Sequence, residues 1–312
     1  TDKSNIQDVV SVLSKKPFIL PKGFNQLGTI SYKGNISGFF SNLVAYGNLS
    51  TNLGSISTDI LLQFGHLLQD LKYNGTIKTS NFQLGRFLSS KALGKIAFNI
   101  NTQGEKNLNK PIKGNLTAKV GELNFNHYKY QDIQLKGSYD GNGFDGAIEL
   151  QDKNIAANFK GKIDLTKRLP FFDFDLKVAD ADLNALHLIS AYPGATLSFT
   201  GKTNMIGNNL DNLNGFATFD SVRFTNQNKT LNLENIKFIS RTTDSYTNFV
   251  IESGFVNGTF SGNFKYSTIG YTINRILQHY LPSLASKNGN SDKGQNHIDI
   301  DLSVENTKDI TD

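Results

Sequence analysis

The stretch from Phe172 to Val178, which reads Phe-Asp-Phe-Asp-Leu-Lys-Val, decides the fold class. Its apolar side chains alternate with Asp173, Asp175 and Lys177, so successive side chains point to opposite faces of a strand. Such alternation is typical of an antiparallel sheet with one apolar and one polar face. The same period of two recurs at Ile96, Phe98 and Ile100, at Ile133 and Leu135, at Phe159 and, after Gly161, Ile163, at Leu197 and Phe199, and at Ile298, Ile300 and Leu302.

Turn signals agree with this period. Asn-Gly or Asp-Gly pairs supply the positive φ of tight hairpins, or mark bulges within strands, and they occur at Asn74, Asp140, Asn142, Asp145, Asn214 and Asn257. Helical spacing is confined to residues 5–14 and 269–281, with one further turn expected at 84–90. Residues 60–71 fit either pattern, and we interpret them as strand.

The composition excludes several classes of site. The chain of 312 residues has no Cys, and its five His residues are scattered. No nucleophile elbow, phosphate-binding loop or dinucleotide-binding motif is present. The net charge of +5 is spread over interspersed Lys, Asp and Glu, without a nucleic-acid footprint. We therefore expect no catalytic residue, no metal, no cofactor and no nucleic-acid partner, and we do not expect an enzyme.

The number of strands restricts the architecture. At about a dozen residues per strand and turn, the chain would hold roughly two dozen strands. So few helices cannot cover that much apolar sheet, and three arrangements remain: two sandwiches, a closed barrel, or one long sheet folded lengthwise into a trough. Periodicity alone does not separate a filled core from an open apolar channel.

Several segments resemble one family. Gly28–Gly54 repeats Gly-Asn-Ile/Leu-Ser, and three further stretches have a similar spacing of Gly, aromatic and aliphatic residues: Tyr128–Tyr139, Gly146–Leu165 and Asn208–Phe219. Together they resemble the TamB (translocation and assembly module) family, in its Bacteroidota branch. The resemblance covers most of residues 23–282.

The resemblance implies an all-β, AsmA-like fold: a long curved β-sheet folded into an elongated, apolar-lined trough (β-taco-like) with one or two short helices. It divides the chain into an N-terminal helix and linker (1–22), the strand trough (23–268), a short helical segment (269–285), a flexible loop (286–296) and a further strand of a truncated continuation (297–312). The two helical segments are expected to plug the trough or to cap a sheet edge.

The resemblance also implies a place and partners. Such a protein lies in the periplasm between the inner and outer membranes, as part of an envelope-biogenesis complex. It is anchored in the inner membrane by an N-terminal helix that is missing from this chain. It engages a BamA/TamA-like outer-membrane barrel through parts outside this chain.

Our leading hypothesis is a non-enzymatic bridge that shields phospholipid acyl chains in a hydrophobic groove during transport. The expected lining is Ile96, Phe98, Ile100, Ile133, Leu135, Phe159, Ile163, Phe172, Phe174, Leu176, Val178, Leu197 and Phe199. One alternative is an assembly or translocation factor for outer-membrane proteins that acts with the barrel through strand pairing. Another is a surface adhesin or sugar-binding protein, for which Tyr128, Tyr130 and Tyr139 would supply the aromatic platform.

Overall fold

The computed structural model describes residues 4–5, 23–39, 41–65, 70–107, 110–190, 192–227, 229–268, 270, 274, 278–279 and 296–304. The fold is all-β, and every strand pair whose register is resolved is antiparallel. The strands are β1 (Ser4–Asn5), β2 (Thr29–Phe39), β3 (Asn42–Thr51), β4 (Gly54–Phe64), β5 (Asp70–Phe82), β6 (Leu93–Asn107), β7 (Lys113–Phe125), β8 (Tyr128–Asp140), β9 (Gly143–Asp152), β10 (Ile155–Asp164), β11 (Phe171–Asp182), β12 (Thr196–Ile206), β13 (Asn214–Asn226), β14 (Lys229–Leu233), β15 (Ile236–Thr242), β16 (Thr247–Glu252), β17 (Val256–Asn263) and β18 (His297–Val304). Three short helices have described bounds: η1 (Phe24–Leu27), α2 (Leu84–Leu88) and η3 (Leu210–Asn212).

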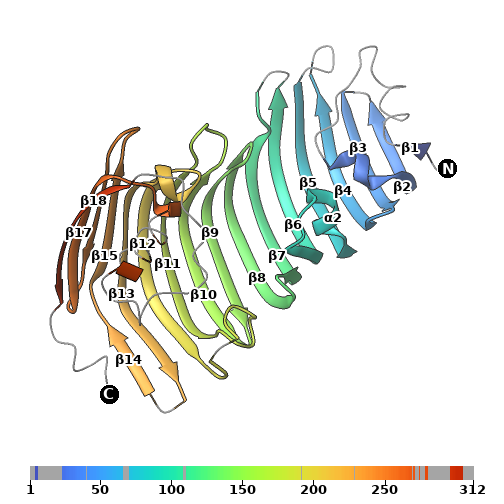
Figure 1. Cartoon of the computed structure of the whole chain (residues 1–312). Helices are drawn as coiled ribbons and strands as arrows, with labels where there is room; N and C mark the ends of the chain where they lie inside the picture. The colour runs from blue at the N-terminus through green and yellow to red at the C-terminus, as the bar shows by residue number, and fades with distance from the viewer. Residues whose placement is uncertain are drawn as a thin grey trace. The chain divides into compact units, whose positions relative to one another are not determined.

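The chain divides into two compact units. Unit 1 comprises Thr1–Lys160 and Ala179–Gly194, and unit 2 comprises Gly161–Val178 and Ala195–Asp312. In unit 1, β2 to β9 form a meander in which each strand pairs with the next one along the chain (Figure 1). Consecutive pairing keeps the loops short, because antiparallel neighbours need only a tight turn.

Unit 2 follows the same rule with one branch. The first half of β13 pairs with β15, and its second half, beyond Ser221, pairs with β14. Ser221 has a positive φ of 53°, and the register with β12 shifts by one residue at the same level, so β13 carries a bulge there. Beyond β15, the strands β16, β17 and β18 continue the meander.

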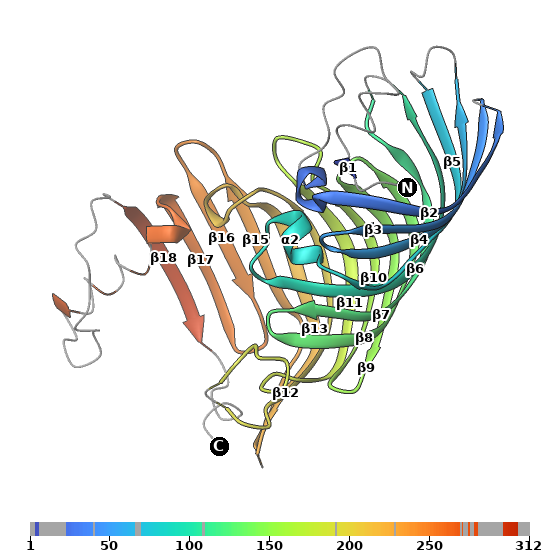
Figure 2. The ribbon, with the colours of Figure 1, turned by 90° about the vertical axis from the view of Figure 1, so that its right-hand side faces the viewer.

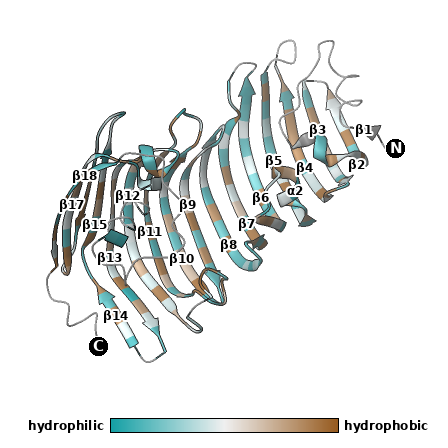
Figure 3. Cartoon of the chain, viewed as in Figure 1, coloured by the Kyte–Doolittle hydropathy of each residue, from teal (hydrophilic) through white to brown (hydrophobic). Residues whose placement is uncertain are grey.

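Burial follows the alternation of the sequence. Exposed and half-buried residues alternate one by one in β3, in β8 from Asp132 onward and in β9 from Phe144 onward, and the hydropathy colours alternate along the strands in the same way (Figure 3). The prediction of an all-β fold with one apolar and one polar face per strand is confirmed. Most apolar side chains are half-buried rather than fully buried, which is what one sheet face without a second full layer produces.

One end of the apolar face in unit 1 is covered. Leu27 of η1, Ile30, Leu53 and Phe82 form a buried cluster, and Leu84 and Phe87 of α2 pack against it together with Leu49, Ile56 and Ile96. Figure 2 shows η1 and α2 side by side over this end of the strands. The helical turn expected at 84–90 is therefore present, and it serves as a local cover.

Three expectations need correction. The described residues hold strands β1 to β18 rather than two dozen, because single strands reach 13 and 15 residues. The strand expected over 60–71 ends at Phe64, and β5 begins at Asp70. Of the expected hairpin glycines, Gly75, Gly146 and Gly258 instead lie inside strands, paired across the sheet. A Cβ on Gly75 would lie 2.2 Å from the carbonyl oxygen of Asp59, so glycine there allows a close approach of two strands.

Several expectations fall outside the described residues. These are the helix at 5–14, beyond Asn5, the flexible loop at 286–295 and the continuation beyond residue 304. Of the segment 269–285, only residues 270, 274, 278 and 279 are described, and these four are helical.

Candidate functional site

The apolar face of unit 1 is built from rows of side chains that cross the strands. One row runs from Ile77 through Ile100, Ala118 and Leu135 to Ile148, and the next from Phe98 through Val120 and Ile133 to Leu150. Register thus brings five of the expected lining residues together on one face: Ile96, Phe98, Ile100, Ile133 and Leu135. All five are half-buried, and the intervening Asn99, Asn101, Gln134 and Lys136 are exposed.

A second feature of this face is the packing of tyrosines over glycines. Gly104 and Gly114 pair directly, flanked in the same row by Tyr73 and Tyr139. The two hydroxyl groups are hydrogen-bonded to each other above the glycines, and the Tyr139 hydroxyl also lies 2.8 Å from Oγ1 of Thr102. Burial and the contact with Tyr139 raise the pKa of Tyr73 well above its ordinary value. Because Gly104 and Gly114 have no side chains, the rings of Tyr73 and Tyr139 can lie over them and cover the apolar face at this row.

The three tyrosines proposed as a sugar platform do not stand free in solvent. Asp132 has a positive φ of 52° and is skipped in the otherwise continuous pairing of β8 with β7, and both Gln131 and Asp132 are exposed while Tyr130 is half-buried. Tyr128 is buried and donates a hydrogen bond of 2.5 Å to Oδ1 of Asp152. Burial and this bond raise the pKa of Tyr128 to about 12. The rings of Tyr128 and Tyr130 pack edge to face with centroids 4.7 Å apart, so they act as packing residues.

The remaining expected residues lie in β10, β11 and β12. In unit 1, the ring of Phe159 lies 6.5 Å from that of Phe144. In unit 2, Val178 is buried and the other six residues are half-buried: Ile163, Phe172, Phe174, Leu176, Leu197 and Phe199. The thirteen expected residues are thus divided between the two units. Exposed polar residues separate Phe172, Phe174, Leu176 and Val178 in β11, whereas Ser198, between Leu197 and Phe199, is half-buried.

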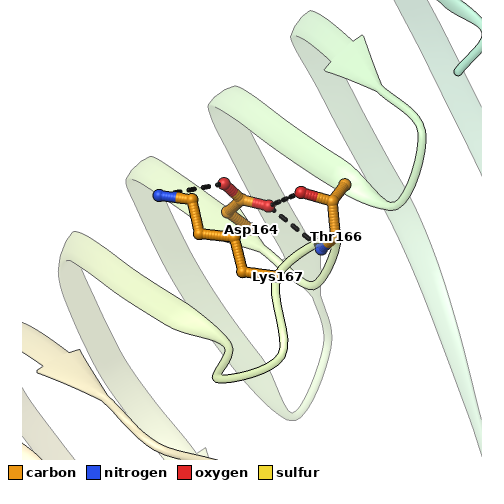
Figure 4. Close-up of polar contacts among 3 residues, drawn as sticks. All are labelled: Asp164, Thr166 and Lys167. Carbon is orange, nitrogen blue, oxygen red and sulfur yellow. Dashed lines mark hydrogen bonds and ion pairs between the residues drawn. The ribbon is translucent and has the colours of Figure 1, made fainter. Parts of the chain in front are cut away.

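The end of β10 is defined by an aspartate turn (Figure 4). Oδ1 of Asp164 accepts hydrogen bonds from the backbone N–H of Thr166, at 3.0 Å, and from its hydroxyl group. Nζ of Lys167 lies 3.8 Å from Oδ2 of the same carboxylate. The Thr166 bonds, and the nearby lysines to a lesser degree, hold the pKa of Asp164 below its ordinary value. This local arrangement ends the strand, as side-chain to backbone bonds of Asp commonly do at turns.

Unit 2 contains a ladder of aromatic rings that crosses five strands. Phe199, Phe219, Phe238, Phe249 and Phe260 come from β12, β13, β15, β16 and β17 in order, with neighbouring centroids 5.6, 6.1, 6.0 and 6.0 Å apart. The Tyr266 ring joins the ladder at Phe249, with the two centroids 5.7 Å apart. These spacings lie within the range in which aromatic pairs attract one another beyond simple burial.

Beside the ladder lies a pocket of about 510 Å³, which we call the phenylalanine pocket. It is lined by Met205, Leu210, Leu213, Ala217, Phe238, Ser240, Phe249, Phe260, Phe264 and Tyr266, all from unit 2. No polar atom is accessible on its wall. The hydroxyl of Ser240 donates to the carbonyl oxygen of Leu213 at 2.6 Å and lies 2.9 Å from the hydroxyl of Tyr266, so both hydroxyls are engaged within the protein.

The rim of the phenylalanine pocket is held by one carboxylate. Asp211 of η3 accepts hydrogen bonds from the backbone N–H and the hydroxyl of Ser267, at 3.0 and 2.7 Å. Partial burial by itself would raise the pKa of Asp211, but the Ser267 bonds and the charge of Lys265 outweigh it and lower the pKa below the ordinary value. This contact ties η3, which carries Leu210, to the segment after β17.

Sequence reasoning found Phe199 but not the rest of the ladder or the phenylalanine pocket. Its members lie on different strands, and only the register brings them together. The available signal was one Phe of the ladder in each of β13, β15, β16 and β17, which becomes informative once the order of pairing is known.

The polar faces carry ion pairs between neighbouring strands. Lys113 and Glu105 are 3.0 Å apart, and Lys237 and Glu252 are 3.1 Å apart, all at least a third exposed. Exposed pairs of this kind contribute little to stability. In the part of the chain that the structure describes, no three His, Asp or Glu side chains gather in a way that could hold a metal ion, and no helix has the length and apolar character needed to span a membrane.

No protein-family model, no curated protein and no solved structure matches the chain.

Proposed function

We propose that the chain is a non-enzymatic, TamB-like segment of a periplasmic bridge, whose apolar faces form a trough that shields phospholipid acyl chains between the inner and outer membranes. The observation that carries the proposal is the half-burial of the apolar faces. Ile100 and Leu135 lie on either side of the buried Ala118 in a row that crosses five strands. A filled sandwich core would bury both completely, and yet both remain partly accessible.

Such a face suits hydrocarbon. Apolar contact is non-directional, and burying one CH₂ group contributes about 0.8 kcal/mol. One acyl chain would gain on the order of ten kcal/mol before the entropy costs of binding are subtracted. Rows of similar Ile, Leu, Val and Ala side chains offer many near-equivalent positions, which favours sliding over tight capture.

The proposal includes the partners that the resemblance implies. The chain would work with a BamA/TamA-like outer-membrane barrel and an inner-membrane anchor, both contacted through other parts of a longer protein. It requires no cofactor and no nucleic acid.

A second candidate is an assembly factor that pairs strands with an outer-membrane client, and β18 favours it. This strand stands at the end of the strand series of unit 2 in Figure 2. Ile300, Leu302 and Val304 on it are 48%, 52% and 53% exposed. An amphipathic strand with so much accessible apolar surface is a template for a further strand.

Mass spectrometry of the chain, purified without detergent, tests the first candidate. We expect phospholipid near stoichiometry in the unaltered chain and its loss in the double variant Phe174→Asp, Leu176→Asp. The control, Lys162→Asp with Lys177→Asp, places two carboxylates at exposed positions, one on β10 and one on β11, and should keep the lipid. Folding of each variant is checked by circular dichroism.

A folded, lipid-free unaltered chain would contradict the conduit. Capture of a barrel protein by that chain, abolished when Ile300 and Leu302 are replaced by Asp, would then support the assembly factor.

A further inference from the structure

The phenylalanine pocket differs from the two hollows over β5 to β8 in having no accessible polar atom on its wall. Its volume of about 510 Å³ falls inside the usual range of small-molecule sites, about 300–1,000 Å³. It is several times larger than the roughly 150 Å³ apolar cavity that suffices to bind benzene in another protein. The space therefore accommodates a segment of a chain molecule rather than a single methyl group or one ring.

The wall defines the chemistry of the occupant. Although Ser240 and Tyr266 line the pocket, their hydroxyls are bonded to each other, and Ser240 also bonds the carbonyl oxygen of Leu213. The occupant is thus offered no hydrogen-bonding partner. A peptide would bring N–H and C=O groups whose desolvation would go uncompensated, and a sugar or headgroup would bring even more polar groups. Hydrocarbon is the one common ligand chemistry that this wall matches.

The wall is also rigid. Phe238, Phe249 and Phe260 contact one another in series, with centroids 6.0 Å apart at each step. Aromatic side chains have few rotatable bonds, so little conformational entropy remains to be lost when a ligand binds. Such a wall fixes an occupant in one place, whereas the aliphatic rows of unit 1 offer repeated, similar positions.

From these observations we infer that the phenylalanine pocket is a discrete binding site for the end of one hydrocarbon chain, at which a lipid pauses in unit 2. The inference rests on the proposed function and adds to it one fixed binding site along the transport path. Leu210, 65% exposed at the rim on η3, marks the side open to solvent.

Fluorescence titration with cis-parinaric acid, a single-chain fatty acid, tests the site on the full chain. We expect one saturable site in the unaltered protein. Ala217→Leu places three additional carbons inside the pocket; the loss of up to three buried methylene contacts lowers the affinity roughly fiftyfold. The matched control Thr218→Leu adds a leucine at the next position of β13, which points to the opposite face, and should bind as the unaltered chain does.

A second pair of variants tests the pocket independently, in case Ala217→Leu does not fold. Leu210→Asp puts a carboxylate on the exposed rim and should weaken binding by at least about tenfold. Leu188→Asp, at a leucine of unit 1 that is 53% exposed, should not change it. Binding of the probe that is indifferent to both Ala217→Leu and Leu210→Asp would overturn the inference, as would the lack of any saturable site.

The failure of this inference and that of the proposed function can be told apart. If phospholipid co-purifies with the chain but the probe ignores both pocket variants, the pocket is refuted and the conduit stands. If no phospholipid co-purifies but one probe site is lost in both pocket variants, the pocket stands and the conduit is refuted.

Discussion

Gly104→Ala is a small change that should have a large effect on unit 1. A Cβ at this position would lie 2.2 Å from the carbonyl oxygen of Lys113 and 2.3 Å from the hydroxyl of Tyr73. The backbone of Gly104 lies outside the positive-φ region, so the cost of substitution is steric. Either β7 must move away from β6 or the Tyr73 ring must leave its place over the glycines.

The magnitude follows from what would be displaced. Overpacking a well-filled site costs about 1–3 kcal/mol. Moving the ring also breaks the contact between the Tyr73 and Tyr139 hydroxyls, and one hydrogen bond contributes a net 0.5–1.5 kcal/mol or so. We therefore expect Gly104→Ala to lower the free energy of unfolding by about 2–4 kcal/mol.

Urea unfolding followed by circular dichroism measures this, and β7 offers a matched control. A Cβ on Gly121 would have no atom within 4 Å, so Gly121→Ala should be neutral or should stabilise by about 0.4–1 kcal/mol through the unfolded state. The Gly104→Ala midpoint should fall by about 1 M urea or more. Equal midpoints for the two variants would refute the account of tyrosines packed over glycines.

Two further predictions concern the cover of unit 1 and the rim of the phenylalanine pocket. Leu53→Ala should lower the free energy of unfolding by about 2–5 kcal/mol because Leu53 is 1% exposed, whereas Ile36→Ala, at 62% exposure, should change it by no more than about 0.5 kcal/mol; similar urea midpoints would contradict the buried cluster. The carboxylate of Asp211, whose pKa is lowered in the folded state, should contribute stability that is complete above its ordinary pKa of 3.8 and is lost as the pH falls through the lowered value. Urea midpoints measured from pH 6 to about pH 2 should therefore fall less steeply in Asp211→Asn than in the unaltered chain, and parallel curves would show that the Ser267 bonds do not matter.

The sequence was sufficient to predict which face each residue occupies. Alternation in β11 placed Phe172, Phe174 and Leu176 opposite Asp173 and Asp175, and their burial follows it. This succeeds because the side-chain period of a strand is a local property, set by the backbone within a few residues.

The register of the strands, and the places where short helices cover the sheet, could not be predicted in the same way. Tyr73 and Tyr139 meet across 66 positions of sequence, and the order of the intervening strands decides that they do. Leu53 lies in the turn between β3 and β4, and Phe82 is the last residue of β5. At such positions a sequence offers no sign that η1 and α2 will bury the side chains. The phenylalanine pocket combines both difficulties, since pairing builds its aromatic wall and η3 its rim.

Photocrosslinking at adjacent positions of β6 tests most directly the claim that the apolar face contacts lipid. A photoreactive p-benzoylphenylalanine replaces either Ile100, on the apolar face, or Asn101, on the opposite face, and each protein is incubated with vesicles of phosphatidylethanolamine and phosphatidylglycerol and then irradiated. The account predicts a phospholipid adduct by mass spectrometry at position 100 and little or none at position 101. Equal adducts at both positions, or none at position 100 of a folded protein, would contradict it.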